Sequence, residues 1–250
     1  DSLNGRYITA EDVGTSPDDM EFVSMETEHV VGLIGRSGDP SPVTAYGVYM
    51  GIKACAQAKY SDDSLAGKHV AVQGLGHVGY YLCKDLAEEG AKLTVTDIDQ
   101  DRVKQVVDEF GAEAVEPDAI YAVDADIFAP CALGAIVNDD TIDVLNVDIV
   151  AGAANNQLAR GPIHGPALDE RGILYAPDYV INAGGLINVY GEIEGWSPER
   201  SKRKAGDIYN TLMRTFELAT TEGLAPHAAA NKVAETRIRE ARHLQRTYLS

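Results

Sequence analysis

Residues 71–99 read AVQGLGHVGYYLCKDLAEEGAKLTVTDID, and this stretch decides the fold. It opens on a short β-branched run, passes through three glycines spaced G-x-G-x-x-G, and continues into a segment with helical periodicity. A second apolar run follows and ends on Asp97. A strand, a glycine turn, a helix and a second strand in this order predict a βαβ unit with two parallel strands.

The glycine loop predicts a binding site for a dinucleotide, although a purely structural glycine turn is the alternative. The first glycine permits a tight turn, the second lets a pyrophosphate approach the backbone, and the third lets the helix pack against the strand. Asp97, at the end of the second strand, is placed to accept hydrogen bonds from a ribose 2′-hydroxyl and to repel a 2′-phosphate. We therefore expect NAD rather than NADP. The loop residues expected to contact it are Gly74, Leu75, Gly76, His77, Val78 and Gly79, followed by Asp97 and Ile98.

Working outward, short apolar runs continue to alternate with helical patterns. Further strands are predicted at 124–130, 147–154, 172–177 and 178–185, and helices at 38–60, 99–111, 198–220 and 228–249. Parallel strands need crossover connections, which cover both faces of the sheet. The fold class we expect is therefore α/β, with a Rossmann-type doubly wound parallel sheet.

The composition excludes several kinds of partner. The 250 residues hold 39 acidic and 21 basic side chains, and a net charge of −18 repels nucleic acid and anionic lipid. A solvated surface and adaptation to high salt both explain the acidity. No apolar run reaches the length of a membrane helix, and Cys55, Cys83 and Cys131 have no metal-ligand or disulfide spacing. We expect a cytoplasmic protein with a small-molecule substrate and no metal site.

Seven motifs occur in order along the chain and together resemble one enzyme family. They are GRYITAEDVGTS (5–16), GDPSPVTAYGVYMG (38–51), VAVQGLGHVG (70–79), VTDID (95–99), DIFAPCALG (126–134), VAGAANNQL (150–158) and YAPDYVINAGGLINV (175–189). This set is similar to the Glu/Leu/Phe/Val amino-acid dehydrogenases, and most similar to the leucine-specific branch. The resemblance runs over nearly the whole chain and is far more specific than the glycine loop alone.

The resemblance implies an activity and a division into domains. Family members reversibly deaminate an L-amino acid to a 2-oxo acid and ammonia, with hydride passing to NAD. It implies a substrate-domain tail over 1–39, an NAD-binding domain over 40–195, and C-terminal helices over 196–250 that pack back towards the substrate domain. The family's two substrate-domain lysines have no counterpart in this sequence, so we expect it to match the C-terminal two-thirds of the enzyme and to form a homo-oligomer when full length. The alternatives are an NAD-binding remnant without turnover, or a phenylalanine or valine dehydrogenase.

The resemblance also assigns candidate site residues. Asp12 matches the acidic residue that exchanges protons with the substrate amino group, although spacing alone favours a helix or turn cap. Thr44, otherwise a capping candidate, matches a threonine that meets the nicotinamide carboxamide. Cys131 has no partner that would make it a nucleophile. Residues expected along the cofactor are Pro130, Cys131, Ala132, Ala153, Ala154 and Asn155, and residues expected at the substrate are Asn155, Asn182, Leu186 and Val189.

Overall fold

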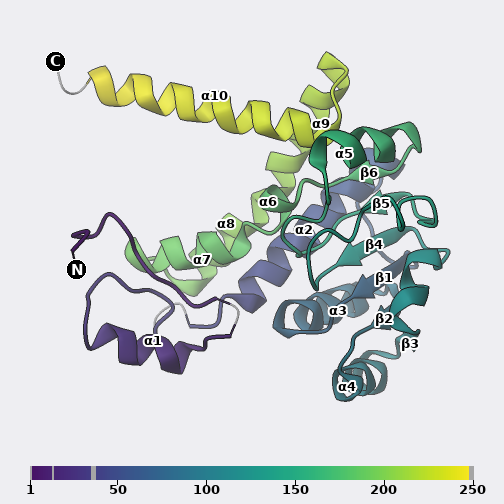
Figure 1. Cartoon of the computed structure of the whole chain (residues 1–250), viewed down its shortest axis with the longest axis horizontal. Coiled ribbons are helices and arrows are strands. Elements are labelled where there is room, and N and C mark those ends of the chain that lie inside the picture. Colours follow the sequence, from purple (N-terminus) through teal and green to yellow (C-terminus); the bar gives the residue numbers. More distant parts are fainter. Residues whose placement is uncertain (1, 13, 35–37, 248–250) are drawn as a thin grey trace.

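The computed structural model describes residues 2–12, 14–34 and 38–247, with side chains up to Arg242, and has an open α/β architecture (Figure 1). Within these residues, six parallel strands form one sheet in the order β3-β2-β1-β4-β5-β6. The strands are β1 (His69–Gln73), β2 (Lys92–Thr96), β3 (Glu113–Ala114), β4 (Ile127–Pro130), β5 (Ile149–Val150) and β6 (Leu174–Tyr175). This is the doubly wound order, so the predicted fold class is confirmed.

The βαβ unit that opens the sheet forms as the sequence predicts. Helix α3 (His77–Glu89) begins directly at the glycine loop and ends at Gly90 in the left-handed conformation. Helix α4 (Gln100–Phe110) begins at Asp99, whose side chain accepts the N–H groups of Asp101 and Arg102, and it ends at Gly111 in the left-handed conformation. A capping carboxylate and left-handed terminal glycines satisfy the backbone groups that helix ends leave unpaired.

Alternating side chains of the central strands build a core on each face of the sheet. Val70 and Val72 point into one core, which also receives α3, α4, the long helix α2 (Ser41–Tyr60) and α9 (Ile208–Glu222). Ala71, between the two valines, points into a second core with Phe128 and Val150. That core is closed by the 3₁₀ helix η1 (Pro117–Ala122) and by α5 (Gly161–Glu170). Burial on both faces explains why these strands are apolar at consecutive positions.

Three parts of the secondary-structure prediction are wrong. Residues 178–185, predicted as a strand, form α6 (Asp178–Ile181) and the start of α7 (Gly184–Ile193), because Ile181 turns inward to pack on Gly51. The helix predicted over 198–220 is interrupted at Asp207, between α8 (Pro198–Gly206) and α9, where Gly206 is a weak helix former. Helix α5 was missed because its two glycines and two prolines are typical of a loop.

The C-terminal helices differ in how much they contact the sheet domain. Ile208, Leu212 and Phe216 of α9 are buried in the main core against α2. Helix α10 (Pro226–Thr247) packs near its start, where Ala229 and Ala230 are buried, while Ile238 further along is exposed. Figure 1 shows α10 extending outward from its contacts with α9, α5 and β6. Residues 248 and 249 of the predicted helix lie outside the described residues.

The N-terminal segment forms a small separate layer. Helix α1 (Pro17–Ser24) is held by a capping box between Ser16 and Asp19, and Met20 packs against Val30 and Leu33. One contact of this layer with the rest of the chain is the Gly32 N–H, which donates to Glu192 Oε2 of α7 at 2.9 Å. Among the described helices, none has the length and apolar character required to cross a membrane.

Candidate functional site

The doubly wound sheet creates a crevice where its strand order reverses. β1 and β4 lie side by side, and the chain leaves them towards opposite halves of the sheet. Ligands of open α/β sheets bind at this point, outside the carboxyl ends of the strands. The glycine loop follows β1 and the Pro130–Cys131–Ala132 stretch follows β4, so two groups of predicted cofactor residues flank the crevice.

Each glycine of the loop has a separate geometric reason. Gly74 has a φ of +94°, and a Cβ atom there would lie 2.8 Å from the backbone nitrogen of Ala132. A Cβ on Gly79 would lie 2.0 Å from the Gly74 carbonyl oxygen, which shows how closely α3 approaches the strand end. A Cβ on Gly76 would meet Arg102 Nη1 at 3.6 Å, an ordinary contact. At the position of this missing Cβ, Arg102 is therefore the one neighbour within 4 Å among the described residues, and the Gly76 backbone is otherwise uncovered there.

Asp97 connects the second strand to the glycine loop. Its Oδ2 accepts the Leu75 N–H at 2.5 Å, and its Oδ1 accepts the Asp99 N–H at 2.9 Å. Two backbone donors fix the orientation of the carboxylate, whose oxygens have lone pairs enough to accept further hydrogen bonds. Ile98, the next residue, is 91% exposed and offers an apolar surface beside the loop.

The loops after β4 and β5 form the other side of the crevice. The Cys131 N–H donates to the Gln73 carbonyl at 2.7 Å, and the Ala154 N–H donates to the Pro130 carbonyl at 2.9 Å. Burial raises the pKa of the Cys131 thiol to about 12. The thiol is therefore protonated near neutral pH, which agrees with its interpretation as a lining residue rather than a nucleophile.

Two asparagines that the sequence analysis selected separately are in contact. Asn182, between α6 and α7, donates through Nδ2 to Asn155 Oδ1 at 2.5 Å and to the Ala153 carbonyl at 3.2 Å. Asn182 therefore orients the Asn155 amide. Thr44 lies in the first turn of α2, where its hydroxyl donates to the Pro40 carbonyl at 2.9 Å. A Cβ on Gly185 would lie 2.8 Å from Thr44 Oγ1, so the start of α7 packs closely on Thr44.

The N-terminal segment approaches the glycine loop through charged residues. Asp39 Oδ2 lies 3.8 Å from His77 Nδ1. Burial and the negative charge of Asp39 raise the pKa of Glu11, although His77 acts in the opposite direction. The neighbouring Asp12 is exposed and forms a turn with Thr15, while the N-cap of α1 is Ser16. Asp12 is therefore not the cap of that helix.

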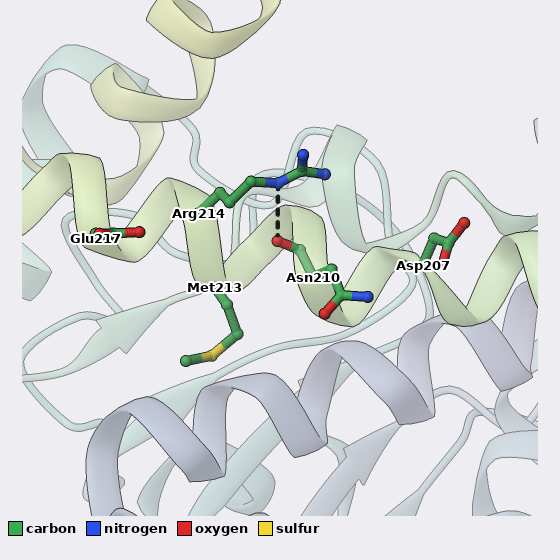
Figure 2. Close-up of a pocket in the computed structure, with 5 residues that line it drawn as sticks. All are labelled: Asp207, Asn210, Met213, Arg214 and Glu217. Atoms are coloured by element: carbon green, nitrogen blue, oxygen red, sulfur yellow. Dashed lines mark hydrogen bonds between the residues drawn. The ribbon is translucent and has the colours of Figure 1, made fainter.

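The remaining predicted substrate residues lie on α7. Leu186 is 75% exposed, and Val189, about one turn further, is partly buried. A groove on α9, lined by Asp207, Asn210, Met213, Arg214 and Glu217, lies elsewhere and includes none of the predicted site residues (Figure 2). In it Arg214 Nε donates to the Asn210 carbonyl of the same helix at 3.2 Å. Over the described part of the chain, no group of three His, Cys, Asp or Glu side chains is arranged to hold a metal ion.

A protein-family model decides the assignment. The model described as Glutamate/Leucine/Phenylalanine/Valine dehydrogenase matches residues 35–101 and 92–246, which is more than half of the chain. The chain belongs to this dehydrogenase family. The resemblance found in the sequence motifs is thereby confirmed, and the protein is an amino-acid dehydrogenase that acts on a CH–NH₂ group.

Individual relatives of this dehydrogenase cover almost all of its chain. Leucine dehydrogenase of Thermoactinomyces intermedius is 56% identical over 99% of this chain and 68% of its own length. L-tryptophan dehydrogenase of Nostoc punctiforme is 49% identical over 97% of this chain and 69% of its own length. A crystal structure of the Nostoc punctiforme L-tryptophan dehydrogenase aligns with a TM-score of 0.87 and 48% identity, over 97% of this chain and 70% of that one. These relatives are named for different amino acids, so the family does not by itself settle the substrate.

A dinucleotide fits the residues that this dehydrogenase presents. A Cβ on Gly74 would clash with Ala132 in the loop after β4, Gly76 exposes its backbone, and Gly79 allows α3 to pack on the strand end. In addition, Gln73 Oε1 and Thr96 Oγ1 are buried at the ends of β1 and β2, beside the loop, and have no hydrogen-bond partner. Buried polar atoms are rarely left unsatisfied, and a ligand or an ordered water explains such cases.

Sequence reasoning missed several residues around this crevice. Gln73 donates through Nε2 to the Tyr121 hydroxyl at 2.7 Å, and Arg102 turns back from α4 towards Gly76. Gln73 could have been found, since it is the one polar residue that ends the first strand. Arg102 could not, because which way a helix side chain turns depends on neighbours that a single sequence does not reveal.

Proposed function

We propose that this chain catalyses the NAD-dependent, reversible oxidative deamination of a branched-chain L-amino acid, with leucine preferred, to the 2-oxo acid and ammonia. The observation that carries the proposal is the Asp97 carboxylate hydrogen-bonded to the glycine loop at the strand-order reversal, in a member of this family. The similarity to leucine dehydrogenase supports the substrate, and the similarity to L-tryptophan dehydrogenase supplies the main competitor.

The preference for NAD over NADP rests on Asp97. Its carboxylate is oriented by two backbone N–H groups, so it stands ready to accept the ribose hydroxyls of an adenosine. A 2′-phosphate at the same place would bring two anions together and would lose these hydrogen bonds. The bare backbone at Gly76 and the N-terminus of α3 supply N–H groups for the pyrophosphate.

Different residues of this chain transfer protons and orient the reactants. When bound, the nicotinamide supplies the acceptor for the hydride that leaves the substrate α-carbon. Asp12 takes a proton from the substrate ammonium, since a protonated amine has no lone pair to assist hydride departure, and it returns a proton as the product imine is hydrolysed. Thr44 and Asn155 orient the nicotinamide and the substrate, and Asn182 holds Asn155 in position.

Leu186 and Val189 supply the apolar surface for the substrate side chain. Both lie on α7, which packs on α2 near Thr44. An apolar pair accepts leucine, isoleucine or valine, although one methylene changes specificity by about 1–3 kcal/mol. This energy limits how sharply the enzyme separates leucine from valine.

The assignment of domains, assembly and location extends the proposal. We assign residues 1–39 to the tail of the substrate domain, 40–195 to the NAD-binding domain and 196–250 to C-terminal helices that pack back towards the substrate domain. Exposed apolar side chains of the N-terminal segment, Tyr7, Phe22 and Met25, support a homo-oligomer built through this layer. Three free cysteines support a reducing, cytoplasmic environment.

The proposal is tested by measuring binding and turnover separately. NADH and NADPH are titrated by fluorescence, and formation of the reduced cofactor is followed with leucine, valine, phenylalanine and tryptophan. We expect tighter NADH binding and a kcat/KM for leucine about tenfold above that for tryptophan. Asp12→Asn should lower kcat about a hundredfold or more while leaving the Kd for NADH unchanged, because it removes the proton acceptor alone.

Three results would contradict parts of this proposal. Tighter binding of NADPH would overturn the role of Asp97. A kcat/KM for tryptophan or phenylalanine above that for leucine would overturn the substrate. NADH binding without turnover of any of the four amino acids would support the alternative of a dinucleotide-binding chain without catalysis.

A further inference from the structure

The side chain of Arg102 lies against the glycine loop. Arg102 belongs to the first turn of α4, yet its Nη1 atom lies 3.6 Å from where a Cβ of Gly76 would be. Its Nε lies 3.3 Å from Asp99 Oδ2, and the side chain is 49% exposed. The guanidinium is therefore held at the mouth of the loop, while its outer N–H groups remain accessible to a ligand.

This position needs a positive charge if an anion is to bind. Asp97, Asp99 and Asp101 lie within five residues of one another at the end of β2 and the start of α4. Three carboxylates oppose the approach of a dinucleotide phosphate, and the N-terminus of α3 offers only the partial charge of its N–H groups. His77, which follows Gly76 in the loop, lies 3.8 Å from a fourth carboxylate, that of Asp39. Arg102 supplies a positive charge next to Gly76, close to these carboxylates.

We propose that Arg102 binds a phosphate of the dinucleotide cofactor, and that this phosphate belongs to the 5′-diphosphate. The inference rests on the proposed function, because it assumes that the loop holds a dinucleotide. A planar guanidinium can donate two parallel hydrogen bonds to phosphate oxygens. The 5′-diphosphate is favoured over a 2′-phosphate because the Asp97 carboxylate occupies the ribose edge and is held there by two backbone N–H groups. Arg102 is thus a cofactor-binding residue whose positive charge offsets the acidic surroundings of the loop.

The test compares variants of one helix by calorimetric titration with ADP-ribose. Arg102→Met keeps the aliphatic part of the side chain and removes the charge, whereas Arg102→Lys keeps a charge but lacks the paired N–H donors of a guanidinium. Lys104→Ala is the control, because it removes a neighbouring charge whose partner is Asp108. We expect Arg102→Met to raise the Kd about tenfold, the effect of losing a charged hydrogen bond at a half-exposed site. Arg102→Lys should recover part of this loss, and Lys104→Ala should leave the Kd unchanged.

The same variants separate the competing explanations. If Arg102→Met lowers the thermal midpoint of the ligand-free protein but leaves the Kd for ADP-ribose unchanged, Arg102 serves only its ion pair with Asp99 and the inference is wrong. If the loss is larger for NADPH than for NADH, the contact is with a 2′-phosphate, and the assignment to the 5′-diphosphate is wrong. If the unaltered protein binds neither ADP-ribose nor NADH, the proposed function fails together with this inference. If the unaltered protein and Arg102→Met bind ADP-ribose with the same Kd, this inference alone is wrong.

Discussion

Gly76 and Gly79 lie three residues apart in the loop, but they have different reasons to be glycine. The Cβ of an alanine at 79 would overlap the Gly74 carbonyl oxygen, whereas an alanine at 76 would make only an ordinary contact with Arg102. Gly79 is thus required by the fold. The fold itself would accept a side chain at position 76. The absence of one there matters instead for a ligand that binds against the loop backbone.

Alanine substitutions should therefore separate stability from binding. Gly79→Ala should lower the free energy of unfolding by about 3 kcal/mol, because α3 must move away from β1, even though alanine is the better helix former by about 1 kcal/mol. Gly76→Ala should change it by less than about 1 kcal/mol but weaken NADH binding about tenfold or more, since the methyl group fills the space of a phosphate. Urea denaturation and NADH titration measure the two effects, and equal losses of stability would contradict this separation.

Single residues also show where sequence reasoning reached its limit. The position of Asp97 beside the glycine loop was predictable because apolar patterning reveals where the preceding strand ends, and its role towards a ribose stays a prediction. The bond between Asn155 and Asn182 was not predictable, because it depends on how the turn between α6 and α7 folds over the end of β5. The roles of Asp12, Thr44, Leu186 and Val189 stay predictions, since they concern a bound substrate and cofactor.

Helices α2 and α3 are joined by a partly buried ion pair. Lys53 of α2 donates to Glu89 Oε1 of α3 at 2.6 Å, and Tyr49 of α2 donates to Glu89 Oε2 at 2.6 Å. The Leu65 N–H, in the segment that leads into β1, adds a third donor at 3.1 Å. Although burial alone would raise it, these hydrogen bonds lower the pKa of Glu89 below its ordinary value of 4.5.

Replacing Glu89 should therefore destabilise the protein in a pH-dependent way. A carboxylate with a lowered pKa in the folded state contributes stability above its ordinary pKa and loses it as the pH falls through the folded value. Glu89→Gln should cost about 2 kcal/mol at pH 7, because Lys53 loses its charged partner, and the difference should shrink below pH 4.5. Urea denaturation of both proteins across this pH range measures it.

Glu88 provides a matched control on the same helix. It forms an exposed i,i+4 pair with Lys84 at 4.0 Å, and such pairs contribute about 0.5 kcal/mol or less. Glu88→Gln should therefore leave stability nearly unchanged at every pH. A constant loss for Glu89→Gln between pH 7 and pH 3 would contradict the titration of Glu89.

The helices and strands that were predicted correctly are those with their own start and stop signals. α3 and α4 both end at glycines in the left-handed conformation, and α4 agrees with the helix predicted over 99–111 to within a residue at each end. Residues 178–185, which form α6 and the start of α7, were predicted as a strand because a short apolar run fits either structure, and the contact of Ile181 with Gly51 decides between them. The strand β3, with two residues, is defined by its pairing with β2 and has no signal of its own.

The whole molecule carries a charge imbalance that its fold must tolerate. With a net charge of −18 spread over 250 residues, compacting the chain brings like charges together and opposes folding. Ion pairs such as that between Arg160 and Asp139 offset this only locally. The repulsion therefore acts over the whole surface, and dissolved salt should relieve it.

Salt should accordingly stabilise this protein, because the screening length falls from about 10 Å at 0.1 M to about 3 Å at 1 M. We expect the thermal unfolding midpoint to rise by several degrees over this range. For a chain of this size, such a shift corresponds to a gain of about 1 kcal/mol or more in the free energy of unfolding. A variant in which exposed Glu113, Glu116 and Asp118 become lysine has a net charge of −12, two units per substitution, and should start with a higher midpoint and gain less from salt. Sucrose, which acts by exclusion rather than screening, should stabilise both proteins equally. An equal response of the two proteins to salt would show that self-repulsion is not what salt relieves, and would leave the acidity explained by a solvated surface alone.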